Sequence, residues 1–265
     1  MKQLLLTTFL LTACVSSTQA DLMAFRDGVN GYDHLMRQVR KANLGSSGST
    51  SAVGSFGGDA HLHSLSSFDL SAIPNNAIIQ QVSLQLVVQN TDSTAGTFEG
   101  VELHAVTNPN TLEITSPGGT DVTTGTTWTN VRTGIPWNIP GGDYDPTPLA
   151  FVSNILHGNM NQAFDDNELF TFQSTPAFVS AVQGALSQNR PFQFLLASFE
   201  QEQNNDRRFV RWKTDLATLE ADRPLLSITY TQIPEPKSGI LFLIGVIGLK
   251  KRMRLKRLSP SPGRR

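Results

Sequence analysis

The sequence predicts an all-β fold, an antiparallel β-sandwich of the jelly-roll type with one short helix. Three observations support this prediction. Short alternating or apolar runs recur through residues 21–232, turn-forming residues separate these runs, and only one segment has helical spacing. A chain with many strands and one helix buries its apolar faces by packing sheet against sheet.

Strands are predicted where apolar residues alternate or where aromatic and branched residues gather. In residues 78–88, apolar side chains recur at every second position from Val82, so they share one face of a strand. Residues 101–106 alternate in the same way, and residues 192–199 and 225–230 are rich in aromatic and branched side chains.

One helix is predicted after Thr175, because Phe178, Val182 and Leu186 follow at helical spacing. Residues 44–58 are rich in Gly and Ser, and we expect them to form a loop within the domain. Residues 21–232 are therefore expected to form one domain.

The N-terminus has the pattern of a signal peptide over residues 1–20. Residues 4–11 are apolar and uncharged, and small or polar residues follow up to Ala20. Cleavage after Ala20 would remove Cys14, the only cysteine, and would leave a body without disulfides. An alternative remains open, because residues 11–14 resemble a bacterial lipobox in which Cys14 would be lipidated.

Charge is segregated along the chain. Residues 21–236 hold 11 Lys or Arg against 22 Asp or Glu, whereas residues 250–265 hold eight Lys or Arg and no acidic residue. The acidic body argues against a nucleic-acid partner, because nucleic-acid binding depends on neutralising phosphates. The basic residues follow an apolar run, which favours a position beside a membrane.

That apolar run, residues 238–249, is twelve residues long and uncharged. As a short hydrophobic helix it would span about 18 Å, less than the roughly 30 Å hydrocarbon core, so it crosses the inner membrane only with snorkelling Lys side chains. The basic residues from Lys250 would stay in the cytoplasm, with the body outside. Pro234, Glu235 and Pro236 form an extended spacer before the run.

In this order, the Pro-Glu-Pro spacer, the apolar residues 240–249 and the basic run from Lys250 resemble the PEP-CTERM sorting signal of Gram-negative bacteria, over residues 233–257. The resemblance implies processing by an exosortase and a place at the cell surface or in the matrix of a species that makes exopolysaccharide. Residues 258–265 form a basic tail that is longer than usual. An ordinary tail anchor after a proline-rich linker is the alternative.

Short motifs also follow a definite order along the body. They are Phe68-Asp69-Leu70-Ser71 with Ile73-Pro74, then Trp128, Pro136-Trp137 and residues 141–145, then Glu200, and finally residues 223–230. In this order they resemble the DNRLRE domain, a β-jelly-roll family related to carbohydrate-binding modules, and only residues 61–64 depart from its pattern. The resemblance implies a jelly roll that contacts polysaccharide or serves as structural bulk.

Patterns for catalysis and metal binding are weak. The sequence has no Gly-x-Ser-x-Gly, phosphate-loop or His-Glu-x-x-His motif. His61 and His63 would share a strand face, but no third metal ligand is evident, so an exposed strand edge is preferred. Asp143 and Asp145 are weak calcium candidates for which simple turn formation is preferred, and no other cofactor is expected.

Aromatic side chains are the best binding candidates, because a pyranose ring has an apolar face that stacks on Trp or Tyr. Trp128, Trp137 and Tyr144 lie in a segment rich in Gly, Pro and Thr that is expected to be loop, and Trp212 lies in a later segment. The alternative is that Trp128 and Trp137 plug the core. A basic cluster around Arg208 would contact an anionic polysaccharide or pair with neighbouring acids.

The sequence therefore favours an exported, non-enzymatic protein of the cell surface or matrix that binds polysaccharide or serves as a structural component. The alternative is a polysaccharide-degrading hydrolase or lyase on a jelly-roll fold. Its carboxylates would come from residues 165–168 and 200–202.

Overall fold

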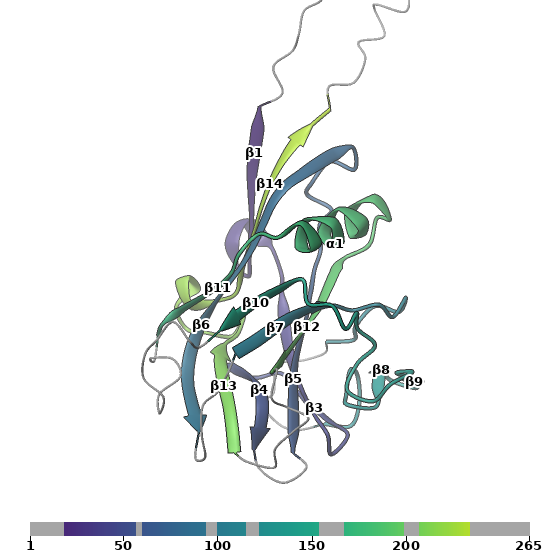
Figure 1. Ribbon diagram of the computed structural model, residues 1–265, viewed down its shortest axis with the longest axis vertical. Coiled ribbons are helices and arrows are strands. Elements are labelled where there is room, and N and C mark those ends of the chain that lie inside the picture. The colour runs from purple at the N-terminus through teal and green to yellow at the C-terminus, as the bar shows by residue number, and fades with distance from the viewer. Residues whose placement is uncertain are drawn as a thin grey trace, which may run out of the picture. The chain divides into compact units, whose positions relative to one another are not determined.

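The computed structural model describes residues 19–56, 60–93, 100–114, 122–153, 167–198 and 207–233, nearly all of them in one compact unit, Gln19–Gln232. Strands dominate this unit and form a large curled antiparallel sheet, with one α-helix among the described residues (Figure 1). Two sides of the sheet face each other across an apolar core, which confirms the predicted β-sandwich with one short helix.

The strands are β1 (Ala20–Arg26), β2 (Leu35–Arg40), β3 (Leu44–Ser46), β4 (Thr50–Phe56), β5 (His61–Phe68), β6 (Ala77–Ser93), β7 (Gly100–Ala105), β8 (Asn130–Arg132), β9 (Ile135–Pro136), β10 (Ala150–Ser153), β11 (Leu169–Phe172), β12 (Phe192–Ser198), β13 (Arg207–Lys213) and β14 (Leu225–Gln232). The helix α1 (Pro176–Ser187) lies between β11 and β12, and η1 (Val29–Gly31) and η3 (Glu220–Asp222) are short 3-10 helices. The four predicted strands correspond to β6, β7, β12 and β14, and the predicted helix to α1.

The long strand β6 joins the two sides of the sandwich. It pairs with β14 over residues 77–85 and with β13 over residues 88–93, and β11 pairs with its middle. The register shifts in both of the first two pairings, and such β-bulges bend a strand. From β13 the sheet continues through β4, β5, β12 and β7 to β10, whereas beyond β14 it ends at β1.

The main core lies between these two sides. The alternating residues of β6 from Val82 to Val88 are buried in it, as their spacing predicts. Aromatic rings join the two sides, because Phe170 of β11 contacts Trp212 of β13 with 4.9 Å between ring centroids. Such tilted aromatic pairs add stability beyond the area that they bury.

The helix α1 covers one end of the main core. The Thr175 side chain caps the helix by accepting a hydrogen bond from the N–H of Phe178 (3.0 Å). The N–H of Ile79 in β6 donates to Oε1 of Gln183 (2.9 Å), which ties the helix to the strand. The buried helix residues include the three predicted from spacing, Phe178, Val182 and Leu186.

A second apolar cluster lies on the outer face of the sheet, under the β7–β10 connection, residues 106–149. The structure describes residues 106–114 and 122–149 of this connection. Its apolar side chains pack on outward-facing residues of β2, β5 and β12; the cluster includes Leu112, Val131 and Trp137 from the connection and Val39, Leu65, Leu195 and Ala197 from the sheet. Both faces of β5 and β12 are therefore largely buried.

Arg37 of β2 fixes this connection to the sheet. Its guanidinium is fully buried, with Nε donating to the carbonyl of Thr126 (2.5 Å) and Nη2 to the carbonyl of Thr124 (2.7 Å). Burial lowers the pKa of Arg37, and the charge of Glu113 partly offsets this. Gly45 of β3 passes so close that a Cβ there would lie 2.6 Å from Nε of Arg37.

The expectation of a Gly/Ser-rich loop at residues 44–58 is wrong, because β3 and β4 occupy most of this range. Small side chains here let neighbouring backbones approach closely. The hydroxyl of Ser51 in β4 hydrogen-bonds to the hydroxyl of Ser64 in β5 (2.6 Å), and both side chains are buried. The composition thus reflects close strand packing rather than a loop.

Within the described residues, no helix is long and apolar enough to cross a membrane. The predicted hydrophobic helix at 238–249 lies outside these residues, as do Pro234, Glu235, Pro236 and residues 1–18 of the predicted signal peptide.

We expect Gly45→Ala to lower the free energy of unfolding by about 1–3 kcal/mol, a typical cost of forcing an extra carbon into a packed interior. The new Cβ would meet the guanidinium of Arg37 and the carbonyl of Thr126. Gly184→Ala in α1 is the matched control, because nothing lies within 4 Å of a Cβ there and alanine favours helix by about 1 kcal/mol. Chemical denaturation measures both changes. A Gly45→Ala variant as stable as the wild type would contradict the close packing around Arg37.

Candidate functional site

Four side chains with rings line up on the outer face of the sheet. Trp128, His63, Tyr144 and His104 follow one another with ring centroids 4.8, 6.1 and 4.8 Å apart. We call these four residues the ring row. The histidines come from β5 and β7 and are buried, whereas Trp128 and Tyr144 come from the β7–β10 connection and are half-buried.

Two glycines let the connection reach the ring row. Gly141 and Gly142 have φ angles of 100° and 129°, which side chains rarely tolerate. A Cβ on Gly141 would lie 2.9 Å from Cζ2 of Trp128, and one on Gly142 would lie 2.7 Å from Cδ1 of Leu195. The Gly141 backbone then holds both neighbouring rings: its N–H donates to the carbonyl of Trp128 (2.6 Å), and its carbonyl accepts from Nδ1 of His63 (2.7 Å).

His104 and Glu102 form a polar end of the ring row. Nδ1 of His104 lies 2.8 Å from the carbonyl oxygen of Asp145, and Nε2 lies 3.1 Å from Oε2 of Glu102. The imidazole therefore lies between a backbone carbonyl and a carboxylate, beside the ring of Tyr144.

The ring row suits binding better than bond cleavage. Trp128 and Tyr144 are half-buried, and the ring of each packs against His63. Their orientation is fixed before a ligand arrives, which reduces the entropy lost on binding. Glu102, the carboxylate bonded to the row, is already paired with His104.

Asp143 organises the turn that precedes Tyr144. Its carboxylate accepts hydrogen bonds from Nδ2 of Asn108 (2.6 Å), from the N–H and Nδ2 of Asn138 (3.1 and 2.9 Å) and from the N–H of Ile139 (2.9 Å). Burial alone would raise the pKa of Asp143, but these hydrogen bonds outweigh burial and hold the pKa below its usual value. Donor hydrogens that surround both oxygens do not fit a calcium ion.

The second calcium candidate, Asp145, is exposed, and its Oδ1 accepts a hydrogen bond from the N–H of Thr147 (2.9 Å). Among the described residues, no three His, Cys, Asp or Glu side chains are grouped so as to hold a metal ion. His63, which was considered with His61 as a metal pair, is buried in the ring row rather than placed at an exposed strand edge.

The remaining aromatic candidates are core residues. Trp137 is 5% exposed in the second cluster, where its Nε1 donates to the carbonyl of Thr127 (2.9 Å), and Trp212 is 0% exposed in the main core. Neither ring offers a face to a ligand, which corrects their proposed binding role. Arg208 lies on β13, and its side chain is outside the described part of the structure.

A buried pair on the other face of the sheet resembles a catalytic dyad. Nε2 of His34 lies 2.5 Å from Oγ of Ser66, the spacing of a base and a nucleophile. Both residues are buried, His34 stacks on Phe68 at 4.0 Å, and burial lowers the pKa of His34 to about 3. A substrate does not reach such a pair, so its role is structural.

Asp215 is a second buried titratable group near this pair. Its Oδ1 accepts a hydrogen bond from the N–H of Met36 in β2 (2.9 Å). Burial raises the pKa of the Asp215 carboxyl to about 6, and the charges of Asp27 and Asp33 add to the rise. The carboxylate therefore anchors the chain between β13 and β14 to β2 at a cost that depends on pH.

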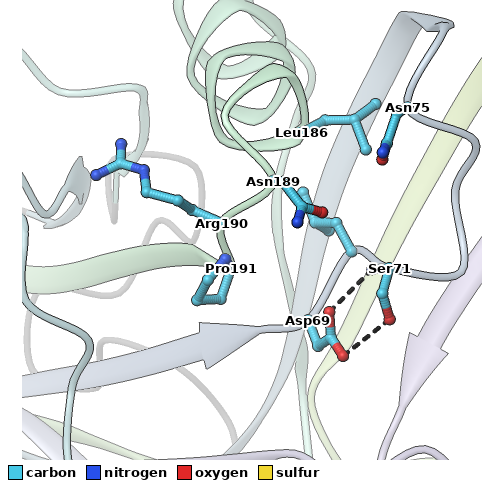
Figure 2. A pocket seen from close by; sticks show the side chains of 8 residues that line it. Asp69, Ser71, Asn75, Leu186, Asn189, Arg190 and Pro191 are labelled. Carbon is cyan, nitrogen blue, oxygen red and sulfur yellow. Dashed lines mark hydrogen bonds between the residues drawn. The ribbon is translucent and has the colours of Figure 1, made fainter.

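A shallow pocket lies where α1 ends. Figure 2 shows Asp69, Ser71, Asn75 and Asn189 around it, with the guanidinium of Arg190 pointing away from the others. The Asp69 carboxylate accepts hydrogen bonds from the N–H and the hydroxyl of Ser71, each at 2.9 Å, and so shapes the turn after β5. No aromatic ring lines this pocket, and the ring row is the better candidate for a sugar ligand.

A scan of the chain against models of protein families and a search of curated proteins found no match. The likeness to a sorting signal and to a carbohydrate-binding family therefore rests on the sequence motifs.

Of the carboxylates considered for hydrolysis, those at 165–166 and 200–202 lie outside the described residues.

Sequence reasoning considered His63 only as a metal ligand and did not connect it, or His104, with the aromatic candidates. His63 and Leu65 are two positions apart on β5, as are Glu102 and His104 on β7, so each pair shares one face of its strand. No local pattern predicts that the β7–β10 connection covers this face.

Asp143→Ala should lower the free energy of unfolding by about 2–3 kcal/mol, because it leaves buried donors without their charged acceptor. Asp145→Ala, which removes one hydrogen bond at an exposed position, should cost less than about 1 kcal/mol. Thermal unfolding of the wild type should be identical with added calcium and with a chelator. A calcium-dependent rise in melting temperature that Asp143→Ala abolishes would show instead that Asp143 binds calcium.

The buried carboxyl of Asp215 makes stability depend on pH. Because its folded pKa is raised from 3.8 to about 6, its favourable contribution is complete below pH 3.8 and is lost as the pH rises through 6. Asp215→Asn keeps an acceptor for the N–H of Met36 and removes the charge. The free energy of unfolding of the variant should exceed that of the wild type by about 3 kcal/mol at pH 8, and this difference should shrink as the pH falls to 4.

Denaturation curves at several pH values test this expectation. His34→Gln gives the opposite comparison, because the folded pKa of His34 is depressed to about 3 and its contribution is lost as the pH falls from 6.5. A difference between Asp215→Asn and wild type that is constant from pH 4 to pH 8 would contradict the buried-carboxyl account.

Proposed function

We propose that the chain is an exported, non-enzymatic protein of the cell surface or extracellular matrix whose β-sandwich binds polysaccharide through Trp128 and Tyr144. One observation carries the proposal: two of the four candidate aromatic residues, Trp128 and Tyr144, are half-buried and both contact His63, which is far from them in the sequence.

The geometry suits a sugar chain rather than a single small ligand. Trp128 and Tyr144 both contact His63, so the site offers two rings near each other for stacking. Stacking against the apolar face of a pyranose supplies contact area, and the half-buried carboxylate of Glu102 at one end offers acceptors for hydroxyls.

Export and sorting follow from the two ends of the chain. The resemblance of residues 233–257 to a PEP-CTERM signal points to an exosortase partner and to transient insertion of residues 238–249 in the inner membrane. The strand pairing supports this proposal, since Ala20, the expected signal-cleavage residue, lies opposite Thr231 at the end of β14. The two segments to be processed therefore leave the domain from neighbouring strand ends.

Retardation of the purified protein in gels that contain a neutral, a uronate or an amino-sugar polysaccharide tests the binding. Trp128→Ala and Tyr144→Ala should each weaken the affinity for the bound polysaccharide roughly ten-fold, as expected for losing one stacking contact. Phe151→Ala is the control, because Phe151 is 46% exposed on β10, outside the ring row. Equal retardation of all variants would remove the ring row from binding.

Absence of retardation in every polysaccharide would leave a purely structural matrix component. Release of reducing or unsaturated sugar ends during the assay would instead favour the hydrolase or lyase alternative. Both outcomes contradict the proposed function and are read in the same experiment.

A further inference from the structure

The two ends of the domain are strand partners. In the pairing of β1 with β14, Ala20 lies opposite Thr231 and Leu22 lies opposite Thr229. In the pairing of β14 with β6, Thr231 lies opposite Ile78. Figure 1 shows β1 and β14 side by side, with the start of β6 beside them. Residues opposite each other, and every second residue along a strand, share a face, so Leu22 and Ile78 lie on the same face of the sheet.

Two large apolar side chains are exposed on this face, together with Gln80, which donates a hydrogen bond to the hydroxyl of Thr231 (3.4 Å). Leu22 is 70% exposed and Ile78 is 46% exposed, and the residue between them, Thr231, is only half-buried. On the opposite face, Ile79 and Tyr230 are buried in the main core, where α1 covers β6. Leu22 and Ile78 therefore do not contribute to the main core.

The surroundings also lack charge. Within residues 19–24, 76–81 and 229–233, Asp21 is the only charged side chain. A protein surface that stays in water normally carries mixed charges, whereas a side chain that enters the acyl region of a bilayer is costly if it is charged. The uncharged composition therefore distinguishes this end from a surface that merely exposes a scattered leucine.

We propose that Leu22 and Ile78 form a lipid-contact patch that rests on the bilayer surface while the chain is anchored. The inference rests on the proposed membrane insertion of residues 238–249. Ser238 lies five positions after Ile233, and an extended chain over that separation reaches at most about 17 Å. Ile78 is opposite Thr231, only seven residues before Ser238, so the tether holds the patch near the membrane.

Site-directed fluorescence on the mature full-length chain, residues 21–265, tests the patch. Single cysteines replace Leu22 or Ile78 and carry a polarity-sensitive probe; the mature chain has no other cysteine. The matched controls are Leu219→Cys for Leu22→Cys, since Leu219 is 65% exposed, and Phe151→Cys for Ile78→Cys, since both residues are 46% exposed. The vesicles contain phosphatidylethanolamine and phosphatidylglycerol, with or without brominated acyl chains.

Probes at Leu22 and Ile78 should show a several-fold rise in emission with vesicles, a blue shift, and quenching by brominated chains, whereas the control probes should not change. Circular dichroism of each labelled variant checks the fold, and all four positions are exposed, so labelling leaves the core intact. Co-sedimentation of the unlabelled chain with vesicles separately measures anchoring.

Each other outcome overturns the inference in a distinct way. Co-sedimentation without a response at Leu22 and Ile78 would remove the patch but keep the anchored protein. Failure to co-sediment would remove the anchoring part of the proposed function together with the patch. A response at all four positions would indicate adsorption without a preferred face. A response that grows with protein concentration in the absence of lipid would assign the patch to a second copy of the chain.

Discussion

The β7–β10 connection forms an outer layer on the sheet, and this layer depends on burial of the Arg37 guanidinium. A cation without water is costly unless acceptors replace its hydration, and the carbonyls of Thr124 and Thr126 supply two of them. These carbonyls satisfy the guanidinium only when the connection lies in one position on the sheet. Gly45 completes the arrangement, because any larger residue would occupy the space of the guanidinium. These hydrogen bonds also fix the position of Trp128, two residues beyond Thr126, on the sheet.

The outer layer turns a plain sheet into a site. The strands alone would present Leu65 and Leu195 to water, and the connection covers them with Val131 and Trp137. The cost of covering is that the connection must pass very near the sheet, which only Gly141 and Gly142 permit. Their passage leaves the rings of Trp128 and Tyr144 at the surface in fixed orientations, so the same packing that stabilises the domain also prepares the candidate binding surface.

The sequence predicted what depends on local pattern and missed what depends on distant contacts. Alternation located β6 and helical spacing located α1, because each signal lies within a dozen residues. The outer layer depends on Trp137 meeting Leu65, more than seventy residues apart, and no local pattern records that contact. For the same reason the sequence could not tell which tryptophans are exposed. The small residues of β4 led to the wrong prediction of a loop, because composition alone does not show that they pack between neighbouring strands.

The pairing of β1 with β14 links the two ends of the chain through the whole fold. β1 is made first and β14 last, and each residue of β1 pairs with one about two hundred positions later. If the chain is exported N-terminus first, β1 has no partner until the final strand has crossed the membrane. The proposed cleavage after Ala20 would act on a residue that the folded domain holds opposite Thr231, and a protease needs an unpaired, extended backbone. Under the proposed export, removal of the leader would belong to the interval before β14 arrives, and the closing of β1 on β14 would then bring the new N-terminus beside the end of β14.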